Sequence, residues 1–451
     1  MNNSDNQLYE FKKKYGNLFT LWLPYPTIFV GGVEQLKEGF IKNNENTSAR
    51  PMIKMWKMMV GGYYGLVFNQ HSFWKSQRKF ALSVLRDFGV GRPILENAVI
   101  DQAAEVCEYF RTLKGEPIDL CKTFCTCIGN IIHQLAFGSM VKIGDDFIFD
   151  FRNKILKGSE IFKHPLTLLM EIWEPIKYLK FFAGKSFHKM IDDNEELLIY
   201  VKKQIKEHRE TINYDSEPRD YIDAFLIEQK KQNPNLEDKS GEWSDMQLIG
   251  SCYDLFGAGM ETTSTTTHTF IFYILHYPEI QAKIHEEIDR VIGKDKIITM
   301  SDQNSLPYFN ACLQEAQRII TLMPINPFHE TIDDVIIDGY TIPKGATIVP
   351  QFDIVHKDET VFENPQKFDP TRFLDEQNNF KADDRVMPYS LGKRGCLGKS
   401  LAKMELFLFW TTFLQHFEFR PEDPNNLPPF EFDYSLSKNI KPFNVRVIER
   451  K

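Results

Sequence analysis

The sequence predicts a mainly α-helical protein with a small β-rich lobe. A long helical pattern runs through residues 244–276, other helical patterns flank it, and β-like runs gather near both ends and at 321–352. The chain has 451 residues, a length that by itself suggests two or three domains. Because no low-complexity linker and no internal repeat divides it, one large domain with a smaller lobe remains open.

The first half of the chain passes from strand to helix. Its elements are expected in this order: β-like runs at 18–23 and 27–30 split by prolines, mostly helix over 72–140, an aromatic- and lysine-rich stretch at 148–183, a charged amphipathic helix at about 185–212, and a polar connection at 213–243.

The second half begins with the longest expected helix. Ser244 and Gln247 have the spacing of a capping box, and the pattern then continues to His276 before Pro278, about 33 residues or roughly 50 Å. The remaining elements are expected in this order: a charged helix from Pro278 to Gly293, a helix starting near Pro307, β-like runs at 321–352, an irregular segment at 353–390, a helix at about 397–414 and a β-like tail from Phe417.

Composition excludes several classes of protein. The hydrophobic fraction of 42% rules out a wholly disordered chain, and the net charge of −8 argues against a nucleic-acid binder. Apolar stretches stop short of the roughly 20 residues that span a bilayer, and the start of the chain is polar, so no signal peptide or anchor is expected. Seven cysteines, few and odd in number, indicate a reducing compartment without a disulfide framework.

The most informative segment is a glycine-rich loop that delivers Cys396 to the start of a helix. Gly392 allows a positive φ or a close approach, and Gly398 leaves space for a flat body beside the first helical turn. The helix N-terminus and the nearby cations Lys393, Arg394 and Lys399 are expected to lower the thiol pKa. Cys396 is therefore predicted to be a thiolate, which acts either as a nucleophile or as a metal ligand.

This loop resembles the haem-binding loop of the cytochrome P-450 monooxygenases, Phe-x-x-Gly-x-Arg-x-Cys-x-Gly, with Tyr389 where the family has Phe. The resemblance implies haem b held by an axial thiolate from Cys396. It also implies a single catalytic domain over 1–451, with the haem between the long helix and the helix after the loop. The hydroxyl of Tyr389 is expected near the sulfur, where a hydrogen bond would weaken electron donation.

The long helix contains a second motif of that family, in Ala258-Gly-Met-Glu261-Thr262-Thr. A run of threonines and two glycines in mid-helix are poor helix formers, which predicts either a solvated face or a locally bent helix with a hydroxyl and a carboxylate poised to relay protons. The resemblance assigns the relay to Thr262, which orders oxygen, and to Glu261, which supplies protons through water.

Two further sets of residues match the family. Glu315 and Arg318, with Arg372 after them, stand in the order of a buried three-residue network that holds the cysteine loop; Glu108–Arg111 and Glu287–Arg290 share the spacing without that context. The expected donors to the haem propionates are Trp74, Arg78, His329 and Arg394. Ala258 and Gly398 complete the expected cofactor-binding set.

A zinc site is the competing metal hypothesis. Cys121, Cys125, Cys127 and His133 are close in sequence, but Cys127 points away from the first two on a helix and no Cys-x-x-Cys pair is present. Core packing is the favoured interpretation of these cysteines.

The resemblance covers nearly the whole chain and is closest to the animal microsomal branch that handles xenobiotics, fatty acids and steroids. That branch begins with a membrane-spanning helix and a Pro-rich hinge, and this chain is expected to start after both. The implied location is the cytoplasmic face of the endoplasmic reticulum membrane, or the cytoplasm without the anchor. The 148–183 stretch, with Trp173, Tyr178, Phe181 and Phe182, is expected to rest on a membrane surface.

The implied reaction inserts one oxygen atom of O₂ into a hydrophobic organic substrate, with NADPH electrons delivered by cytochrome P-450 reductase and a second donor in cytochrome b5. No nucleotide-binding motif is found in the chain itself. Substrate contacts are expected around 59–68, at Phe256 and Ala258, at 322–327 and near Leu436. Two alternatives stay open: a haem-thiolate isomerase or dehydratase that needs no reductase, and a non-catalytic haem carrier or sensor.

Overall fold

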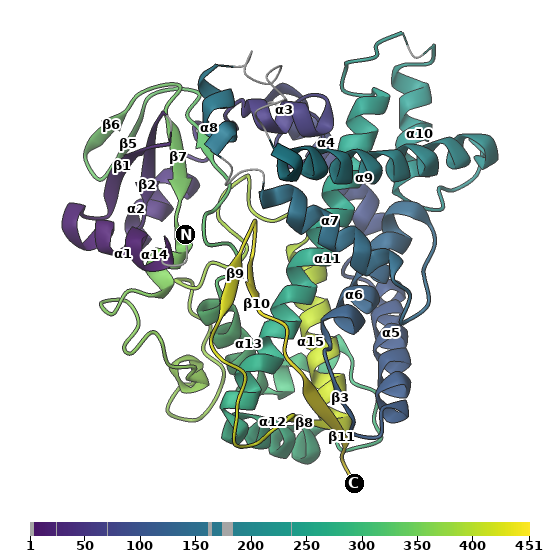
Figure 1. Cartoon of the computed structure of the whole chain (residues 1–451), viewed down its shortest axis with the longest axis vertical. Helices are drawn as coiled ribbons and strands as arrows, with labels where there is room; N and C mark the ends of the chain where they lie inside the picture. Colours follow the sequence, from purple (N-terminus) through teal and green to yellow (C-terminus); the bar gives the residue numbers. More distant parts are fainter. Residues whose placement is uncertain (1–3, 24, 70, 161–164, 174–183, 236) are drawn as a thin grey trace.

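The computed structural model describes the chain except for residues 1–3, 24, 70, 161–164, 174–183 and 236 (Figure 1). The helices are α1 (Ser4–Tyr15), α2 (Val33–Lys37), η1 (Glu38–Lys42), α3 (Lys54–Val60), α4 (His71–Asp87), α5 (Pro93–Thr112), α6 (Cys121–Phe137), α7 (Phe147–Ser159), α8 (Pro165–Ile172), α9 (Gly184–Thr211), α10 (Tyr221–Gln232), α11 (Asp245–His276), α12 (Pro278–Val291), η5 (Met300–Ser305), α13 (Pro307–Ile320), α14 (Phe352–His356), η6 (Pro370–Phe373) and α15 (Lys399–His416).

The strands are short, and all but one fall where the sequence predicts them, near both ends and at 321–352; the exception is β3, inside the stretch 72–140 that was expected to be mostly helical. They are β1 (Leu18–Trp22), β2 (Pro26–Val30), β3 (Pro117–Ile118), β4 (His329–Glu330), β5 (Val335–Ile337), β6 (Tyr340–Ile342), β7 (Thr347–Pro350), β8 (Phe417–Pro421), β9 (Phe432–Tyr434), β10 (Lys438–Ile440) and β11 (Val445–Glu449).

A four-stranded sheet of order β1-β2-β7-β4 forms the β-rich lobe. Strands β1 and β2 pair antiparallel, as expected of two runs divided by a proline-rich turn, and β7 then joins β2 in parallel. This pairing brings the N-terminal strand β2 beside β7, which lies far from it in the sequence, at the left of Figure 1. The lobe encloses its own apolar cluster, which includes Val30, Ile348 and Val355.

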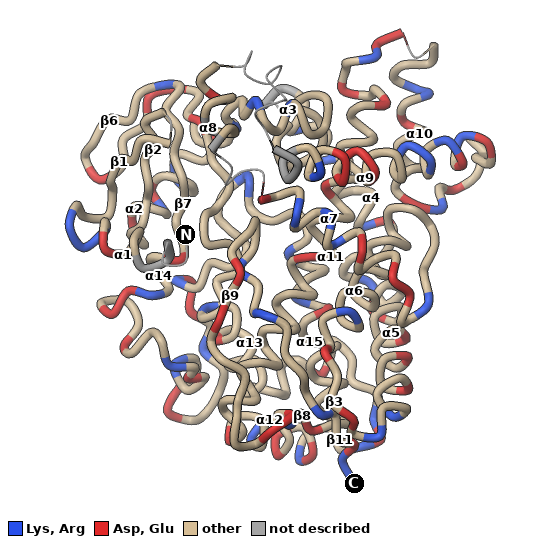
Figure 2. Tube along the Cα trace, viewed as in Figure 1, with Lys and Arg blue, Asp and Glu red and all other residues tan. Residues whose placement is uncertain are grey.

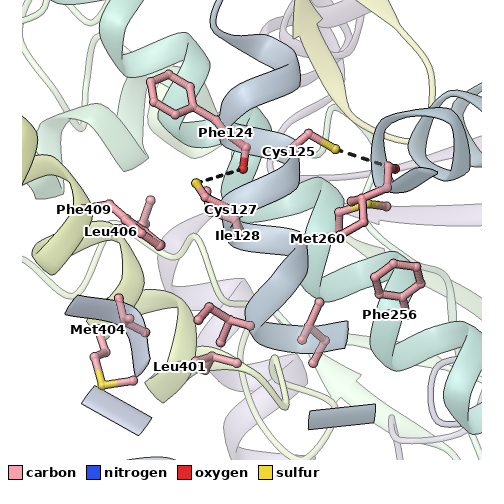
Figure 3. Packing of buried hydrophobic residues seen from close by; sticks show 14 of the residues in the cluster. Phe124, Cys125, Cys127, Ile128, Phe256, Met260, Leu401, Met404, Leu406 and Phe409 are labelled. Carbon is pink, nitrogen blue, oxygen red and sulfur yellow. Dashed lines mark hydrogen bonds between the residues drawn. The ribbon is translucent and has the colours of Figure 1, made fainter. Parts of the chain in front are cut away.

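The helical part of the molecule is built around α11, against which α6 and α15 pack (Figures 1 and 3). Figure 3 shows Phe256 and Met260 of α11 among side chains of α6 and α15, and all of those labelled are buried. The glycines of α11 permit this close packing, because a Cβ at Gly259 would lie 2.9 Å from Ile132 of α6. A helix buried on nearly every side suits the apolar sequence on both flanks of its threonine run.

The threonine run of α11 is buried, not solvated. The helix continues without a break over Asp245–His276, and Thr263 and Thr267 are among its buried residues. Two of its hydroxyls bond a carbonyl one turn back; Thr262 donates to Ala258 O at 2.7 Å and Thr266 to Thr262 O at 2.7 Å. Such local bonds let poor helix formers stay in a buried helix.

Only half of the expected capping box forms at the start of α11. The Ser244 hydroxyl accepts a hydrogen bond from Gln247 N at 3.3 Å, as the spacing predicts. The Gln247 amide binds the loop around Gly65 and Asn69 instead, with its oxygen accepting from Asn69 at 3.0 Å. The tertiary contact thus replaces the reciprocal half of the box.

Charged residues of both signs are spread over the molecule (Figure 2). The second half of α15, from Leu406 to His416, contains no Lys, Arg, Asp or Glu. Helix α1 lies in a polar segment for which the sequence predicted no element, and its Lys12 forms an ion pair with Asp358. Within the described residues, no helix combines the length and the apolar character that crossing a bilayer requires.

Candidate functional site

The cysteine loop is held by close backbone contacts before α15 begins. Cys396 N donates to Tyr389 O at 2.8 Å, and Gly395 N donates to Gly392 O at 3.1 Å. Gly392 has a φ of 65°, and a Cβ there would lie 1.9 Å from Phe40 O, so both its conformation and its contact require glycine. Gly398 is the N-cap of α15, which places the cysteine at the helix N-terminus as predicted.

The expected lowering of the Cys396 pKa is wrong for the haem-free protein. Burial raises this pKa, and the Gly398 N–H, Arg78 and Lys399, which act in the opposite direction, do not compensate. Cys396 is nevertheless exposed, so it is open to a ligand. The thiol therefore keeps its proton until a cation replaces it, because a coordinating metal deprotonates a thiol outright.

Two positions, one in mid-helix and one beside the cysteine, are open. Ala258 is exposed in the middle of the otherwise buried α11, and Thr262, one turn later, is half-buried. A Cβ added at Gly398 would meet nothing within 4 Å, so there is space beside the start of α15.

Three buried or partly buried arginines lie near this space without a carboxylate partner in the described part of the chain. Arg50 donates to Phe328 O at 2.7 Å, Arg394 to Ser48 O at 2.7 Å, and Arg78 to Gly395 O at 2.6 Å. Burial and the neighbouring Arg78 lower the pKa of Arg50 to about 9; burial, Arg50 and Arg78 lower that of Arg394 to about 8. Since a guanidinium keeps its proton in proteins, these directions indicate a site that favours an anionic group.

The residues present therefore fit a flat, doubly anionic cofactor such as haem, with its two carboxylates facing the arginines. Sequence reasoning found Arg78 and Arg394 but missed Arg50. It lies in an ordinary Ser-Ala-Arg-Pro stretch with no motif around it, and only the fold brings it to this site.

The two other expected donors differ in their environment. Trp74 is buried, and the Arg394 guanidinium lies 3.8 Å from the centre of its ring. His329 is buried and its Nδ1–H donates to Thr47 O at 2.7 Å. Burial and the charges of Arg50 and Arg394 hold the pKa of His329 well below its usual value, although the hydrogen bond to Thr47 acts in the opposite direction. The one N–H of the neutral ring donates to the Thr47 carbonyl and is therefore not available to a propionate.

Glu261 lies in a buried network that sequence reasoning did not predict. Its carboxylate is 2.5 Å from Arg152 Nε of α7, and it accepts from Thr265 at 2.9 Å and from Ser437 at 2.6 Å. Arg152 also donates to Asn439 of β10 at 2.7 Å, so the network joins three elements. The carboxylate and the Thr262 hydroxyl, although adjacent in sequence, thus have separate partners.

The Glu315 network is brought together as expected. Arg318 Nε is 2.6 Å from Glu315 Oε2, Arg372 Nε is 3.3 Å from Oε1, and the first two residues are almost fully buried. The two other pairs with the same spacing, Glu108–Arg111 and Glu287–Arg290, do not form such a network. Arg111 Nη1 lies 2.6 Å from Glu108 Oε1 in a surface ion pair.

Glu287, from the second of these pairs, caps a helix. Glu287 accepts from Tyr308 N at 2.9 Å and Phe309 N at 2.8 Å, at the start of α13. Identical spacing therefore yields a buried network, a surface ion pair or a cap, depending on the surroundings.

A pocket of about 230 Å³ lies between α3, α9 and α11, at a distance along α11 from Ala258. Its lining is mostly apolar, with methionines from two of the three helices: Met58, Met59, Val60, Gly61, Ile191, Asn194, Glu195, Leu198, Lys202, Met246 and Ile249. It includes the start of the predicted 59–68 substrate region. Phe256, in contrast, is fully buried against Phe151 and Phe137 and has no exposed surface for a substrate.

The cysteines considered for zinc point to different partners. Cys125 Sγ lies 3.9 Å from Ile148 O and Cys127 Sγ lies 3.4 Å from Phe124 O (Figure 3). Burial raises the pKa of Cys121 to about 11, which keeps a thiol protonated. The described residues do include one group of possible metal ligands, formed by His208, Asp220 and Asp223. However, the Asp223 carboxylate is already in an ion pair, with its Oδ2 2.5 Å from Arg219 Nε.

Two of the lysines near the loop are already paired. Lys75 lies 3.0 Å from Glu45, and Lys393 contacts the same carboxylate. They are therefore not free to bind an acidic partner without breaking these pairs.

Comparison with known proteins places the whole chain in one family. A family description, Cytochrome P450, matches residues 1–447. A probable cytochrome P450 CYP36A1 of Caenorhabditis elegans is 37% identical, over 98% of this chain and 89% of that protein. Cytochrome P450 2C7 of Rattus norvegicus is 36% identical over 94% of this chain and 86% of its own length, and cytochrome P450 2D26 of the same species is 34% identical over 99% and 89%.

These matches agree with the loop, the arginines and the exposed turn of α11. Cytochrome P450 enzymes are oxidoreductases that incorporate molecular oxygen and carry haem b on a cysteine thiolate. The chain belongs to the cytochrome P450 family.

Proposed function

We propose that residues 1–451 form one haem-thiolate monooxygenase domain that oxidises a hydrophobic organic molecule of the xenobiotic, fatty-acid or steroid class. NADPH–cytochrome P-450 reductase supplies the electrons, with cytochrome b5 as a second donor. The observation that carries the proposal is the group of three arginines around the Cys396 loop, Arg50, Arg78 and Arg394, which lack carboxylate partners among the described residues.

Each residue of the site has a proposed task. Cys396 is the axial ligand, and the bound haem supplies the redox chemistry that activates O₂. Arg50, Arg78 and Arg394 hold its propionates, and Trp74 orients the guanidinium of Arg394 through ring contact at 3.8 Å. Ala258 and Gly398 keep the two faces of the site clear.

Thr262 and Glu261 are proposed to manage protons. Thr262 presents a hydroxyl whose proton is held at Ala258 O in this structure, at the exposed turn of α11. Glu261 stays paired with Arg152, so it can act only after that pair opens or through water.

The Glu315, Arg318 and Arg372 network is proposed to be structural. Asp369 N also donates to Glu315 at 2.8 Å, and Arg318 donates to His356 O at 2.7 Å. The network therefore connects α13 to the segment that leads into the cysteine loop.

The Thr262→Ala variant tests the reaction assignment. We expect it to bind haem normally but to divert NADPH electrons to hydrogen peroxide, because losing a proton-transfer group typically costs about 10²- to 10⁴-fold in rate. Product and peroxide per NADPH are the measurement, with reductase and a panel of fatty acids and drugs. Thr266→Ala, one turn later on the same helix, is the matched control.

An unchanged product yield per NADPH in Thr262→Ala would contradict the relay. Product formation without any NADPH would instead favour the isomerase or dehydratase, and no turnover at all with reductase would favour a haem carrier.

We propose a location at the cytoplasmic face of the endoplasmic reticulum membrane, with peripheral contact through an apolar rim. The rim consists of exposed side chains from the β1–β2 turn, the segment before α3, and the region of α8: Trp22, Leu23, Tyr25, Met52, Leu169, Ile172 and Trp173. Contacts through Glu171 join these segments, since Tyr25 donates to its carbonyl at 3.1 Å and Met55 N to its side chain at 2.9 Å. The expected membrane residues Tyr178, Phe181 and Phe182 lie outside the described residues.

A further inference from the structure

The loop between α3 and α4 packs directly against α11. Gly65 has a φ of 93°, and a Cβ there would lie 2.4 Å from the Asp254 carboxylate and 2.9 Å from Gly250 O. A Cβ at Gly250 would in turn lie 2.7 Å from Gly65 N. Because no side chain separates the two backbones at this point, the position of the loop is set by the helix.

Asp254 of α11 binds the backbone N–H groups of this loop. Its buried Oδ2 accepts from Leu66 N at 2.6 Å and from Val67 N at 2.9 Å, and no cation pairs with it among the described residues. Gln247, about two turns earlier on the helix, accepts from Asn69 Nδ2 at 3.0 Å. Two side chains of α11 therefore hold the loop from one side.

The carbonyl groups of the same loop bind two of the three arginines of the candidate site. Val67 O accepts from Arg50 Nε at 3.2 Å and from Arg394 Nη1 at 3.4 Å. Asn69 O accepts from Arg394 Nη2 at 3.1 Å. Val67 therefore connects α11 to both guanidinium groups, because its N–H binds Asp254 and its carbonyl binds the arginines.

The loop carbonyls leave each guanidinium with donors for an anion. A guanidinium has five N–H groups, and those that the backbone does not use decide where an anion can bind. Arg50 uses its Nε and Nη1 donors on backbone carbonyls, so both N–H groups of its Nη2 are without a partner in the described part of the chain. Arg394 makes three bonds to carbonyls and keeps its other two N–H groups. The directions of these remaining donors depend on where the loop carbonyls lie.

We propose that Asp254 is a positioning residue for the cofactor site, which holds the 65–69 loop and so directs the remaining donors of Arg50 and Arg394 toward an anion. This inference rests on the proposed role of the arginines in holding the carboxylates of haem. No hydrogen bond or ion pair between described residues joins Asp254 to either guanidinium, so it acts through the loop backbone. A guanidinium whose carbonyl partners shift loses its alignment with the anion, which weakens a charge-assisted hydrogen bond.

The test is haem retention by the haem-loaded full chain, measured as the rate of haem transfer to an excess of an apo-globin acceptor. We expect Asp254→Ala to release haem about tenfold faster than wild type, the order expected when a hydrogen bond to a charged group is lost. Asp254→Asn should stay within about twofold of wild type, because both N–H groups bind a single carboxylate oxygen, which the amide oxygen can replace.

A background without the two arginines separates positioning from a general loss of stability. In the Arg50→Met, Arg394→Met double variant, adding Asp254→Ala should change the rate by less than about twofold, because the groups that it positions are absent. Gln247→Met, which releases Asn69, keeps the test decisive if Asp254→Ala fails to fold. It should speed haem transfer about threefold in the wild-type background and leave it unchanged in the double variant.

Glu287→Ala is the matched control. Glu287 is also buried and also accepts two consecutive backbone N–H groups, at 2.9 and 2.8 Å, but it does so at the start of α13. Its removal should lower the free energy of unfolding and leave the rate of haem transfer within about twofold of wild type.

A wild-type rate in both Asp254→Ala and Gln247→Met would overturn the positioning role. So would an equal acceleration in Glu287→Ala, an effect of Asp254→Ala that persists without the arginines, or an Asp254→Asn variant as fast as Asp254→Ala. A wild-type chain that binds neither haem nor iron-free protoporphyrin IX would refute the proposed cofactor site instead, so the two failures are distinguishable.

Discussion

Arg50 is the residue whose importance depends most on the fold. It is buried beside Arg78 and Arg394, and its donors reach only backbone carbonyls, including Val67 O at 3.2 Å. Three such cations are unfavourable in one place unless an anion joins them. We therefore expect an anionic cofactor to stabilise this part of the molecule by pairing with the three arginines.

The Arg50→Met variant should retain haem more weakly than the wild-type protein. Loss of a hydrogen bond to a charged group costs about 1.5–3 kcal/mol, so we expect haem to dissociate about 10- to 100-fold faster. The measurement is haem transfer to an excess of an apo-globin acceptor. Arg86→Met, at an exposed position on α4, is the matched control and should match wild type; equal rates in the two variants would contradict the role of Arg50.

The sequence predicted the contacts of residues that stand in a motif of fixed spacing. It did not predict properties that depend on how distant parts of the chain pack. The spacing from Tyr389 to Gly398 fixed the cysteine loop, and Glu315, Arg318 and Arg372 came together as expected. The thiol pKa was predicted in the wrong direction, because local cations are visible in the sequence and burial is not.

At the scale of elements, ion pairs between helices decide how the molecule responds to pH. His208 of α9 lies 2.8 Å from Asp220, which caps α10 through a bond from Asp223 N at 2.9 Å. His208 Nδ1 donates to Gln204 O at 2.7 Å, so both ring nitrogens face acceptors and the imidazolium form is favoured. Burial lowers the pKa of His208, but the hydrogen bond and charge of Asp220 outweigh it and the net direction is upward.

This direction fixes the sign of the pH dependence. A histidine with a raised folded pKa contributes its full stability below the unfolded value of about 6.5, and the contribution is lost as pH rises through the folded pKa. We therefore expect the difference in unfolding free energy between wild type and His208→Gln to be larger at pH 6 than at pH 9. Urea unfolding at the two pH values is the measurement.

The control for this element is Thr211→Ala at the end of α9, where a non-titrating hydroxyl donates to Glu207 O at 3.0 Å. Its effect on the unfolding free energy should be the same at the two pH values. A pH-independent effect of His208→Gln would mean that the histidine stabilises the helices by packing alone.

The elements themselves were largely predictable. Helices α11, α12 and α13 start within a residue or two of the Ser, Pro and Pro signals that predict them. What the sequence could not provide is the partner of each element. The Gln247 amide turned to the 65–69 loop, and Phe256 turned into the core instead of toward a substrate, because packing across elements decides both.

At the level of the whole molecule, the apolar rim marks the side of the protein that we expect to face the membrane. Trp22 and Trp173 are 74% and 56% exposed, which is unusual for such large apolar side chains and is what the proposed membrane contact requires. Because the rim draws on segments about 150 residues apart in the sequence, only the folded chain could reveal it.

We expect the triple variant Trp22→Ser, Ile172→Ser and Trp173→Ser to bind vesicles of phosphatidylcholine and phosphatidylserine at least about tenfold more weakly than wild type, since large apolar side chains contribute about 1.5–3 kcal/mol each when fully buried. Vesicle sedimentation is the measurement. Ile297→Ser with Tyr340→Ser, at exposed apolar sites elsewhere, is the control, and equal losses in both would refute a specific rim.

The central claim is that the sulfur of Cys396 binds the haem iron, and the reduced carbon-monoxide spectrum tests it most directly. The account predicts a thiolate-type Soret band in the wild-type protein and in Cys252→Ala, where a fully buried cysteine of α11 is removed. It predicts that Cys396→Ala loses this band. A thiolate-type spectrum that survives in Cys396→Ala, or a nitrogen ligand in the wild-type protein, would contradict it.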